Sequence, residues 1–398
     1  MSAKRSLDES AELAKKTWIE INGRAAKKNC QAFRKVIGPR VNPNQSSLQR
    51  AGSNGVKLWA VVKSNAYGHG LLAFSRAVER DVDGFCVDSV IEGIKLRRAG
   101  IKKFILVLGP TLPAPLREAG AYGITVSISN FDALKSLAAM KNRPAFHLKI
   151  DTGMHRQGFY LEDLPKVERA LLRMKEKAAG IFTHFASAKD IHYPTYTEKQ
   201  YSVFQEAVRA LRRASLPEKT FIKHCAATGG VLVGGKYFED AVRVGMGLYG
   251  YFPSPELKIR ANAPKKFSLV PVLSWKAAVS EVKKLKPGDY IGYDLSERVS
   301  RPTTMAILPI GYWHGMPRSL SGKGKVWISG RLGKILGRVS MDLLVVDVTG
   351  IPCRAGDSAM LVGPESGVLA DEIGEQAGTT HYEFLTRLNP LIERRVIH

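Results

Sequence analysis

The segment most informative about the architecture reads Leu58-Trp59-Ala60-Val61-Val62-Lys63-Ser64-Asn65-Ala66-Tyr67-Gly68-His69-Gly70. Its first five residues are apolar, as in a buried strand, and the glycines that follow allow backbone to approach a ligand closely. Lys63 stands where this strand ends. A desolvated amine is easily deprotonated and can form a Schiff base with an aldehyde such as pyridoxal phosphate (PLP). The alternative is a lysine that extends past the strand end into water.

An alternation of strands and helices surrounds this segment. Apolar runs predict strands at Leu58–Lys63, Gly84–Asp88, Phe104–Gly109, Ile124–Ser127, Ala145–Asp151, Gly180–Phe185, Phe221–Cys225 and Ala241–Gly245. Amphipathic stretches predict helices at Leu71–Arg80, Val90–Arg98, Phe131–Met140, Leu161–Lys175 and Glu198–Arg213. Eight strands alternating with helices indicate an α/β fold, a (β/α)8 TIM-type barrel, although a doubly wound sheet has the same local alternation.

The pattern changes after Phe252-Pro253-Ser254-Pro255. Short alternating runs then predict strands at Val272–Val282, Tyr290–Tyr293, Thr304–Pro309, Lys325–Ile328, Leu343–Val348 and Ala359–Val362. They indicate an all-β C-terminal domain, which the short N-terminal strand Thr17–Ile21 joins. We therefore expect a polar leader and strand in residues 1–22, a PLP-binding barrel in 23–262 and a β-rich domain in 263–398.

Composition narrows the class of protein. The net charge is +24, but the basic residues are scattered, so we expect a basic surface and no nucleic-acid partner. Four cysteines lie far apart without metal-ligand spacing, which favours free thiols and no metal site. The first ten residues lack the apolar core of an export signal, and no apolar run approaches the roughly 20 residues of a membrane span. We expect a cytoplasmic protein without a membrane partner.

Polar groups lie at or near the ends of five predicted strands. They are Lys63, the pair Lys149 and Asp151, His184, Thr228, and Arg243 with Gly245. Because a barrel gathers its reactive groups at the carboxyl ends of its strands, this joint placement predicts an active site there.

Several motifs resemble those of alanine racemases, and together they span nearly the whole chain. Besides the lysine segment they are Thr17-Trp18-Ile19-Glu20-Ile21, His147-Leu148-Lys149-Ile150-Asp151-Thr152-Gly153-Met154-His155-Arg156-Gln157-Gly158, Thr183-His184-Phe185-Ala186, Arg243-Val244-Gly245-Met246-Gly247-Leu248-Tyr249-Gly250, Tyr290-Ile291-Gly292-Tyr293 and Gly337-Arg338-Val339-Ser340-Met341-Asp342. The resemblance implies a fold-type III enzyme whose PLP is carried by Lys63.

The resemblance also implies roles for other barrel residues. Lys149 is carbamylated and orients Arg156, which touches the cofactor and the substrate carboxylate; the alternative is a Lys149–Asp151 surface pair. Arg243 bonds the pyridine nitrogen, and His184 supports Arg243. A cation at that position disfavours protonation of the ring and weakens its electron withdrawal, which favours racemisation over transamination. The implied phosphate ligands are Tyr67, Thr228, Gly245, Met246 and Tyr382.

In the β domain, the resemblance makes Tyr293 the second catalytic base and places the Met341 amide against the substrate carboxylate. The residues implied at the substrate entrance are Tyr312, Arg318, Arg338 and Asp342. Two departures from the family pattern are Ala227-Thr228 in place of Asn-Ser and Trp313-His314 in place of Ala-Asp.

The implied reaction is racemisation of L- and D-alanine by Lys63 and Tyr293, which supplies D-alanine for peptidoglycan. Because the family's tyrosine comes from the partner subunit, a homodimer with composite sites is implied. The alternatives are another fold-type III PLP enzyme, either a broad-specificity racemase or an amino-acid decarboxylase, and a non-catalytic basic binder.

Overall fold

The structure is a computed structural model that describes residues 16–38, 55–174, 178–212, 221–263 and 267–398. The chain forms two compact units. One contains the described residues up to Arg24, together with Tyr67–Ala73 and Pro271–His398; the other contains Ala25–Ala66 and Phe74–Val270. We call them the β unit and the barrel unit.

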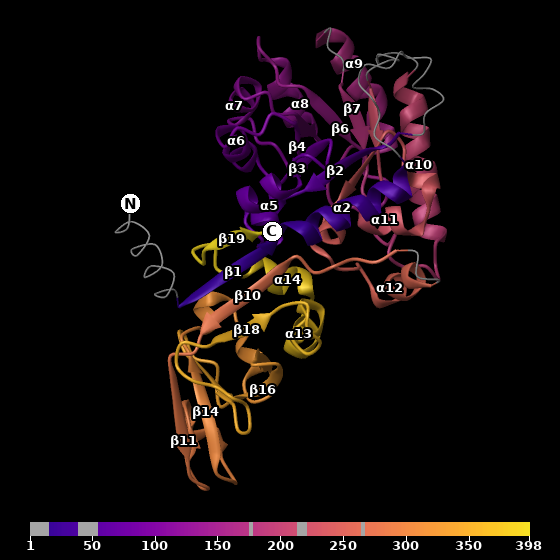
Figure 1. The fold of residues 1–398 in the computed structure, drawn as a ribbon. Coiled ribbons are helices and arrows are strands. Elements are labelled where there is room, and N and C mark those ends of the chain that lie inside the picture. The colour runs from indigo at the N-terminus through magenta and orange to yellow at the C-terminus, as the bar shows by residue number, and fades with distance from the viewer. Residues whose placement is uncertain (1–15, 39–54, 175–177, 213–220, 264–266) are drawn as a thin grey trace. The chain divides into compact units, whose positions relative to one another are not determined.

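Eight parallel strands form the barrel unit (Figure 1). They are β2 (Lys57–Val61), β3 (Gly84–Val87), β4 (Phe104–Val107), β5 (Val126–Ile128), β6 (Phe146–Lys149), β7 (Gly180–Phe182), β8 (Ile222–His224) and β9 (Ala241–Val244). Their hydrogen bonds give two four-stranded sheets, β4-β3-β2-β9 and β5-β6-β7-β8. Bridges at Leu106–Thr125 and Ala227–Arg243 join the two sheets into a closed ring.

Closure confirms the predicted barrel. The last strand, β9, pairs in parallel with the first, β2, with Trp59 opposite Arg243. An open doubly wound sheet has two unpaired edges, so that alternative is excluded. Most strand residues are fully buried, as expected when helices cover a parallel sheet on its outer face.

Helices lie outside the strands of the barrel (Figure 1). They are α2 (Gly23–Ile37), α5 (Leu71–Val78), α6 (Val90–Arg98), α7 (Leu116–Ala121), α8 (Phe131–Ala138), α9 (Leu164–Met174), α10 (Thr195–Arg212), α11 (Thr228–Val233) and α12 (Pro255–Asn262). Side-chain caps begin three of them, since Ser89 accepts from the Glu92 amide, Asn130 from the Ala133 amide and Ser254 from the Leu257 amide.

A nine-stranded sheet forms most of the β unit, in the order β11-β14-β17-β16-β15-β18-β10-β1-β19. Its strands are β1 (Thr17–Asn22), β10 (Leu273–Ala278), β11 (Glu281–Leu285), β14 (Thr303–Leu308), β15 (Lys325–Ile328), β16 (Arg331–Leu336), β17 (Leu344–Asp347), β18 (Ser358–Val362) and β19 (Arg394–Ile397). A separate hairpin pairs β12 (Tyr290–Ile291) with β13 (Glu297–Arg298). Two short helices, α13 (Ala370–Ala377) and α14 (His381–Thr386), accompany the sheet and were not expected from the sequence.

The N-terminal strand joins the C-terminal sheet, as predicted. β1 pairs antiparallel with β10 and parallel with β19, so it lies between strands that are far away in sequence. The predicted run Val272–Val282 is in fact two strands with different partners, since β10 pairs with β1 and β18 and β11 pairs with β14.

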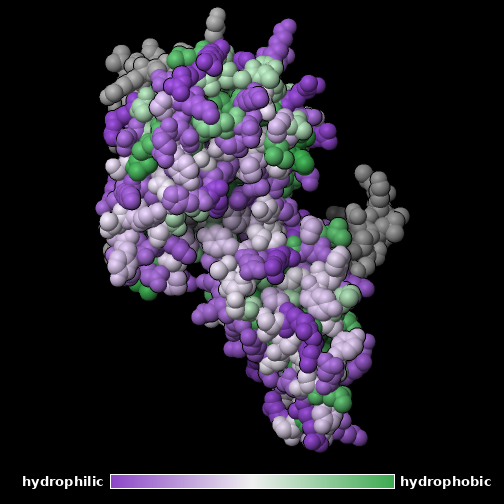
Figure 2. Space-filling model, turned by 180° about the vertical axis from the view of Figure 1, so that it is seen from behind, coloured by the Kyte–Doolittle hydropathy of each residue, from purple (hydrophilic) through white to green (hydrophobic). Residues whose placement is uncertain are grey.

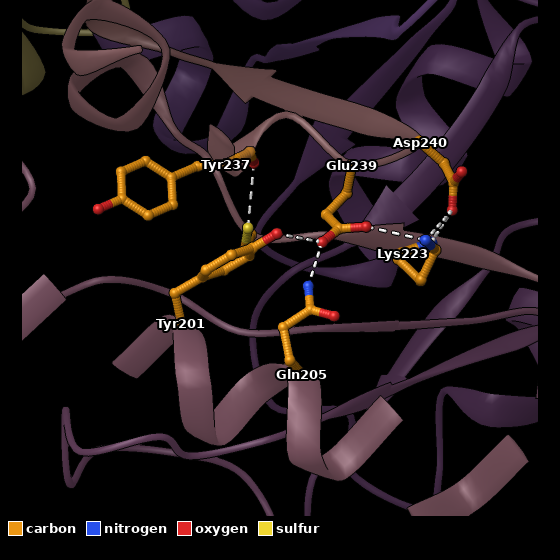
Figure 3. A network of polar contacts seen from close by, with 7 residues as sticks. Tyr201, Gln205, Lys223, Tyr237, Glu239 and Asp240 are labelled. Carbon is orange, nitrogen blue, oxygen red and sulfur yellow. Dashed lines mark hydrogen bonds and ion pairs between the residues drawn. The ribbon is translucent and has the colours of Figure 1, made fainter. Parts of the chain in front are cut away.

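A buried carboxylate ties helix α10 to two barrel strands (Figure 3). Glu239 is 8% exposed; it accepts hydrogen bonds from the Tyr201 hydroxyl at 2.8 Å, from the Gln205 amide, and from Lys223 Nζ at 2.8 Å. Asp240 adds a bond to the Lys223 amide at 2.8 Å. Burial and the Glu239 carboxylate raise the pKa of Tyr201, so the phenol remains a donor. This network lies where β9 begins, away from the carboxyl ends of the strands.

The visible surface is mostly hydrophilic, and hydrophobic side chains are scattered over it in small groups (Figure 2). Within the described ranges, no helix has both the length and the apolar character required to cross a membrane.

The Glu239 network generates a stability prediction. Replacing Glu239 with Gln puts an amide donor against the Lys223 and Tyr201 donors and leaves buried groups unpaired. We expect the free energy of unfolding to fall by about 1–3 kcal/mol in urea denaturation followed by circular dichroism. The matched control is Glu198→Gln, which breaks an exposed 2.6 Å ion pair with Lys236 and should leave the free energy of unfolding nearly unchanged, because exposed ion pairs contribute little. Equal losses in the two variants would contradict the role given to Glu239.

Candidate active site

A left-handed turn follows strand β2. Lys63 opens the short helix α4 (Lys63–Tyr67), and Ser64, Asn65, Ala66 and Tyr67 all have φ between 52° and 55°. Each such residue costs about 1–2 kcal/mol relative to the right-handed conformation. Four in succession therefore need support from their surroundings, and strain of this kind clusters at functional sites.

Glu92 of helix α6 supplies part of that support. Its carboxylate accepts from the Asn65 amide at 3.2 Å and from the Asp88 amide at 2.8 Å. One acidic group thus joins the strained turn to the end of strand β3, and it holds Asp88 beside Lys63.

Lys63 lies in a less buried position than the sequence suggested. Its side chain is 38% exposed, and its Nζ lies 3.3 Å from Asp88 Oδ1. The amine is therefore half-buried and ion-paired rather than desolvated at the end of a buried strand. Asp88 comes from the neighbouring strand and was not anticipated as a site residue.

Arg243 is a buried cation in the barrel interior, only 2% exposed. Nη1 donates to the His224 carbonyl at 3.0 Å and to His224 Nδ1; Nη2 donates to the Thr183 carbonyl at 2.6 Å and the Cys225 carbonyl at 3.1 Å. In the part of the chain that the structure describes, Nε has no hydrogen-bond partner and no acidic side chain pairs with this guanidinium.

The imidazole that supports Arg243 differs from the one expected. It belongs to His224, and among the described residues His184 makes no hydrogen bond to Arg243. The role expected of His184 is therefore wrong in this respect. His184 lies two residues after the end of strand β7. His224 ends strand β8, which lies beside β9, the strand that carries Arg243.

Lys149 ends strand β6 and is 6% exposed. Its Nζ donates to Gln157 Oε1 at 2.6 Å. Burial, followed by the nearby cations Arg156 and Arg243, lowers the pKa of Lys149 to about 8. A substantial fraction of this amine is therefore neutral near physiological pH.

Asp151 organises the loop after Lys149. Its carboxylate accepts from the backbone amides of Gly153, His155, Arg156 and Gln157 at 3.0, 3.0, 2.8 and 3.3 Å. These bonds hold the pKa of Asp151 below its usual value although burial opposes the shift. The alternative of a Lys149–Asp151 surface pair is wrong, because each group is bound elsewhere.

This loop presents Arg156 as a free cation. The residue is exposed, and its guanidinium makes no hydrogen bond or ion pair with any described residue. A pocket of the barrel unit is lined by Arg156 together with Lys149, Ile150, Asp151, Met154, Gln157, Thr183 and His184. Burial and the nearby cation Arg243 lower the pKa of His184 to about 3, so its ring is neutral there.

The remaining expected barrel residues lie around the start of α11. Thr228 Oγ1 accepts from the Gly245 amide at 3.2 Å and lies 3.5 Å from the Gly247 amide. Gly247 has no room for a side chain, because a Cβ there would come 2.4 Å from the Phe33 ring and 2.9 Å from Thr228 Cγ2. Met246 is buried between these two glycines.

Two expected phosphate ligands lie together in the β unit. The rings of Tyr67 and Tyr382 are 6.2 Å apart, and burial raises the pKa of Tyr382 to about 12, so that its hydroxyl stays protonated. Gly68 next to Tyr67 must be glycine, since a Cβ would come 1.9 Å from the Leu385 carbonyl oxygen.

Tyr293 is highly accessible in the β unit. It begins a single turn (Tyr293–Leu295) after the β12 strand and is 71% exposed. Its hydroxyl has no hydrogen-bond partner among the described residues. Asp294 in the same turn pairs with Arg338, one of the expected entrance residues, at 3.0 Å.

A clamp between two loops positions Met341 and Tyr312. The Tyr312 amide donates to the Ser340 carbonyl at 3.0 Å, and the Trp313 amide to the Met341 carbonyl at 3.1 Å. The Met341 amide makes no hydrogen bond in the described ranges and the residue is 54% exposed. The other expected entrance residues, Arg318 and Asp342, are exposed, and Asp342 Oδ1 lies 4.0 Å from His314 Nδ1.

The structure thus gathers Lys149, Arg156 and His184 at one pocket, and Tyr67 beside Tyr382. Sequence reasoning missed Asp88, Glu92, Gln157 and His224. Two of them had a usable signal: Asp88 ends the predicted strand Gly84–Asp88, and His224 lies one residue before the end of the predicted strand Phe221–Cys225. No cluster of three or more His, Cys, Asp or Glu side chains able to hold a metal occurs among the described residues.

Comparison with known proteins gives the family. The model of the alanine racemase N-terminal domain matches residues 40–253, and that of the alanine racemase C-terminal domain matches residues 272–396. An alanine racemase of Leptospira interrogans is 32% identical over 389 residues, which cover 96% of both chains.

Solved structures agree with these matches. An alanine racemase from Bacillus anthracis with bound L-Ala-P superposes with a TM-score of 0.85 at 27% identity, covering 96% of this chain and 95% of that one. An alanine racemase from Bartonella henselae with covalently bound pyridoxal phosphate has a TM-score of 0.79 at 25% identity, covering 96% and 100% of the two chains. The chain described here belongs to the alanine racemase family.

Proposed function

We propose that the chain interconverts L- and D-alanine with PLP as cofactor and with Lys63 and Tyr293 as its two bases. The family is PLP-dependent, and relatives carry PLP or an alanine analogue. The observation that carries the proposal is the contrast between two arginines of the barrel unit. Arg243 is buried and bound by the protein, while Arg156 is exposed and unpaired, ready for a carboxylate.

The residues present fit PLP. Arg243 keeps one unused N–H donor, Nε, which suits a pyridine nitrogen that accepts. Thr228, the amides around Gly245, and the two tyrosine hydroxyls at Tyr67 and Tyr382 are donors suited to a phosphate. Lys149 and Arg243 are buried in the barrel unit and form no ion pair with any described acidic residue, which suits an anionic cofactor and an amino-acid carboxylate.

Each residue then has a distinct task in the reaction. PLP, when bound, withdraws electrons from the amino acid and acidifies its α-hydrogen. Lys63 holds the cofactor and exchanges a proton with the α-carbon on one face, and Tyr293 does so on the other. Arg156 and the free Met341 amide bind the substrate carboxylate. Arg243, as a cation, keeps the pyridine nitrogen unprotonated.

We propose that Tyr293 acts on the barrel of a second copy of the chain. Its phenol is exposed and unpaired in the described residues, as a group reserved for another subunit would be. A homodimer would then contain two composite sites, each with Lys63 of one subunit and Tyr293 of the partner subunit. D-alanine made in the cytoplasm would supply peptidoglycan.

The role of Lys63 as the residue that carries PLP can be tested by reduction with borohydride. Purified protein should be yellow, and borohydride should fix PLP to Lys63, as read by mass spectrometry of the modified peptide. Lys63→Ala should abolish this adduct and racemisation together. The assignment fails if the variant yields the same reduced adduct.

Tyr293→Phe removes one base without changing the size of the ring. We expect α-hydrogen exchange of L-alanine in deuterated water, followed by NMR, to slow by about 10²–10⁴-fold, the usual contribution of a general base. Unchanged L-alanine exchange would exclude the role of Tyr293.

Coexpression of Lys63→Ala with Tyr293→Phe tests the composite sites in the same series. Random pairing gives one intact site in half of the dimers, so about a quarter of wild-type activity should return. If both groups acted within one subunit, no activity would return.

We also propose that Lys149 carries a carbamate. Only a neutral amine adds carbon dioxide. The ammonium group first loses one proton and the addition releases a second, so that a cation beside Arg156 becomes an anion. With the pKa lowered to about 8, the neutral fraction rises as pH rises through 8. Protein in ¹³C-bicarbonate should therefore show a carbamate ¹³C signal that grows between about pH 6 and 9 and is absent in Lys149→Met. The same signal in Lys149→Met would refute the site.

A further inference from the structure

A second buried histidine extends the contact between Arg243 and His224. His147 is fully buried on strand β6, and its Nδ1 lies 2.8 Å from His224 Nε2. Its other ring nitrogen, Nε2, is buried and has no hydrogen-bond partner among the described residues. The proposed reaction gives this residue no task.

The order of donors along Arg243, His224 and His147 is fixed by their chemistry. A guanidinium only donates, so His224 Nδ1 must accept from Arg243 Nη1. The proton of His224 is then on Nε2, which donates to His147 Nδ1. His147 in turn must carry its proton on Nε2, the atom without a partner.

Both imidazoles are neutral in this arrangement. Burial, followed by the charge of Arg243, lowers the pKa of His147 to about 3 and that of His224 well below the usual value. A protonated ring would place a third donor in a chain that has no acceptor for it.

An aromatic cage surrounds the pair. The His224 ring stacks on Phe182 with centroids 4.7 Å apart, and Trp59 contacts both imidazoles at 4.8 and 6.0 Å. Gly180 makes room for His147, since a Cβ there would come 2.7 Å from His147 Nδ1. A phenylalanine would suit such a cage without burying an unpaired N–H, so packing alone does not explain a histidine.

We propose that His147 is a positioning residue that fixes the Nε2–H tautomer of His224 and thereby the orientation of Arg243. This inference rests on the proposed function, because it gives Arg243 the place beside the pyridine nitrogen. Without an acceptor at residue 147, the Nε2–H tautomer of His224 would bury an unpaired donor and lose its advantage over the Nδ1–H tautomer, which faces Arg243 donor to donor. The guanidinium of Arg243 would then lose its orientation, and its Nε would no longer be held in position for the cofactor.

A change in the orientation of Arg243 has a chemical signature that is separate from the rate of racemisation. Once Arg243 is displaced, the pyridine nitrogen can take a proton, which strengthens electron withdrawal and favours transamination. In that side reaction, alanine and PLP give pyruvate and pyridoxamine phosphate, the amino group passing to the cofactor. Pyruvate released per racemisation turnover therefore reports the orientation of Arg243.

The test compares His147→Asn with His147→Leu, two side chains of similar shape. Asparagine keeps an acceptor oxygen close to the position of Nδ1, and leucine does not; both remove the ring from the cage. We expect the pyruvate ratio to rise about tenfold in His147→Leu and to stay within about twofold of wild type in His147→Asn. Equal ratios in the two variants would overturn the proposal, since a purely structural role predicts them.

Imidazole tautomers give a second measurement that needs no turnover. Long-range ¹H–¹⁵N spectra of histidine-labelled wild-type holoenzyme should show the neutral Nε2–H pattern for both His147 and His224. A wild-type His224 protonated on Nδ1 would overturn the inference. Failure to bind PLP or to racemise alanine would refute the proposed function, and the same spectra of the protein would still decide the tautomers.

Discussion

The guanidinium of Arg243 lies inside a closed barrel, where a charge without polar contacts would be costly. Its bonds go to the carbonyls of Thr183, His224 and Cys225, which lie at the ends of β7 and β8. One side chain from β9 therefore fixes where two neighbouring strands end and their loops begin. Thr183 and His184, in the first of these loops, also line the pocket that contains Lys149 and Arg156, so this cation fixes one side of that pocket.

The barrel could be predicted because most of its strands are short, largely apolar runs bounded by polar residues, a pattern that can be recognised locally. The N-terminal strand was also predictable, since Thr17–Ile21 alternates with no local partner. Strand β19 was not predicted, because two of its four residues are Arg394 and Arg395 and its apolar part is too short to show a pattern. Strand β16 contains a glycine, and α13 and α14 are too short for a periodic pattern to stand out.

The site was predicted less completely than the fold. Residue types at strand ends identified Lys63, Lys149 and Arg243 as candidates, and the resemblance to alanine racemases added Arg156. Their partners, such as Asp88 beside Lys63 and His224 beside Arg243, come from the adjacent strand and follow only from tertiary pairing. The left-handed turn after Lys63 was also beyond reach, because serine, asparagine, alanine and tyrosine have no common preference for positive φ.

The hydrogen bond between Glu92 and Asn65 affects how a barrel of this kind can diversify. The Glu92 carboxylate belongs to the second strand–helix repeat, yet it binds the amide of Asn65 in the first. A first repeat transplanted without the second would therefore arrive with a strained turn that lacks one of its supporting hydrogen bonds. We expect substitutions in helix α6 to be accepted only together with compatible residues in the turn that follows Lys63.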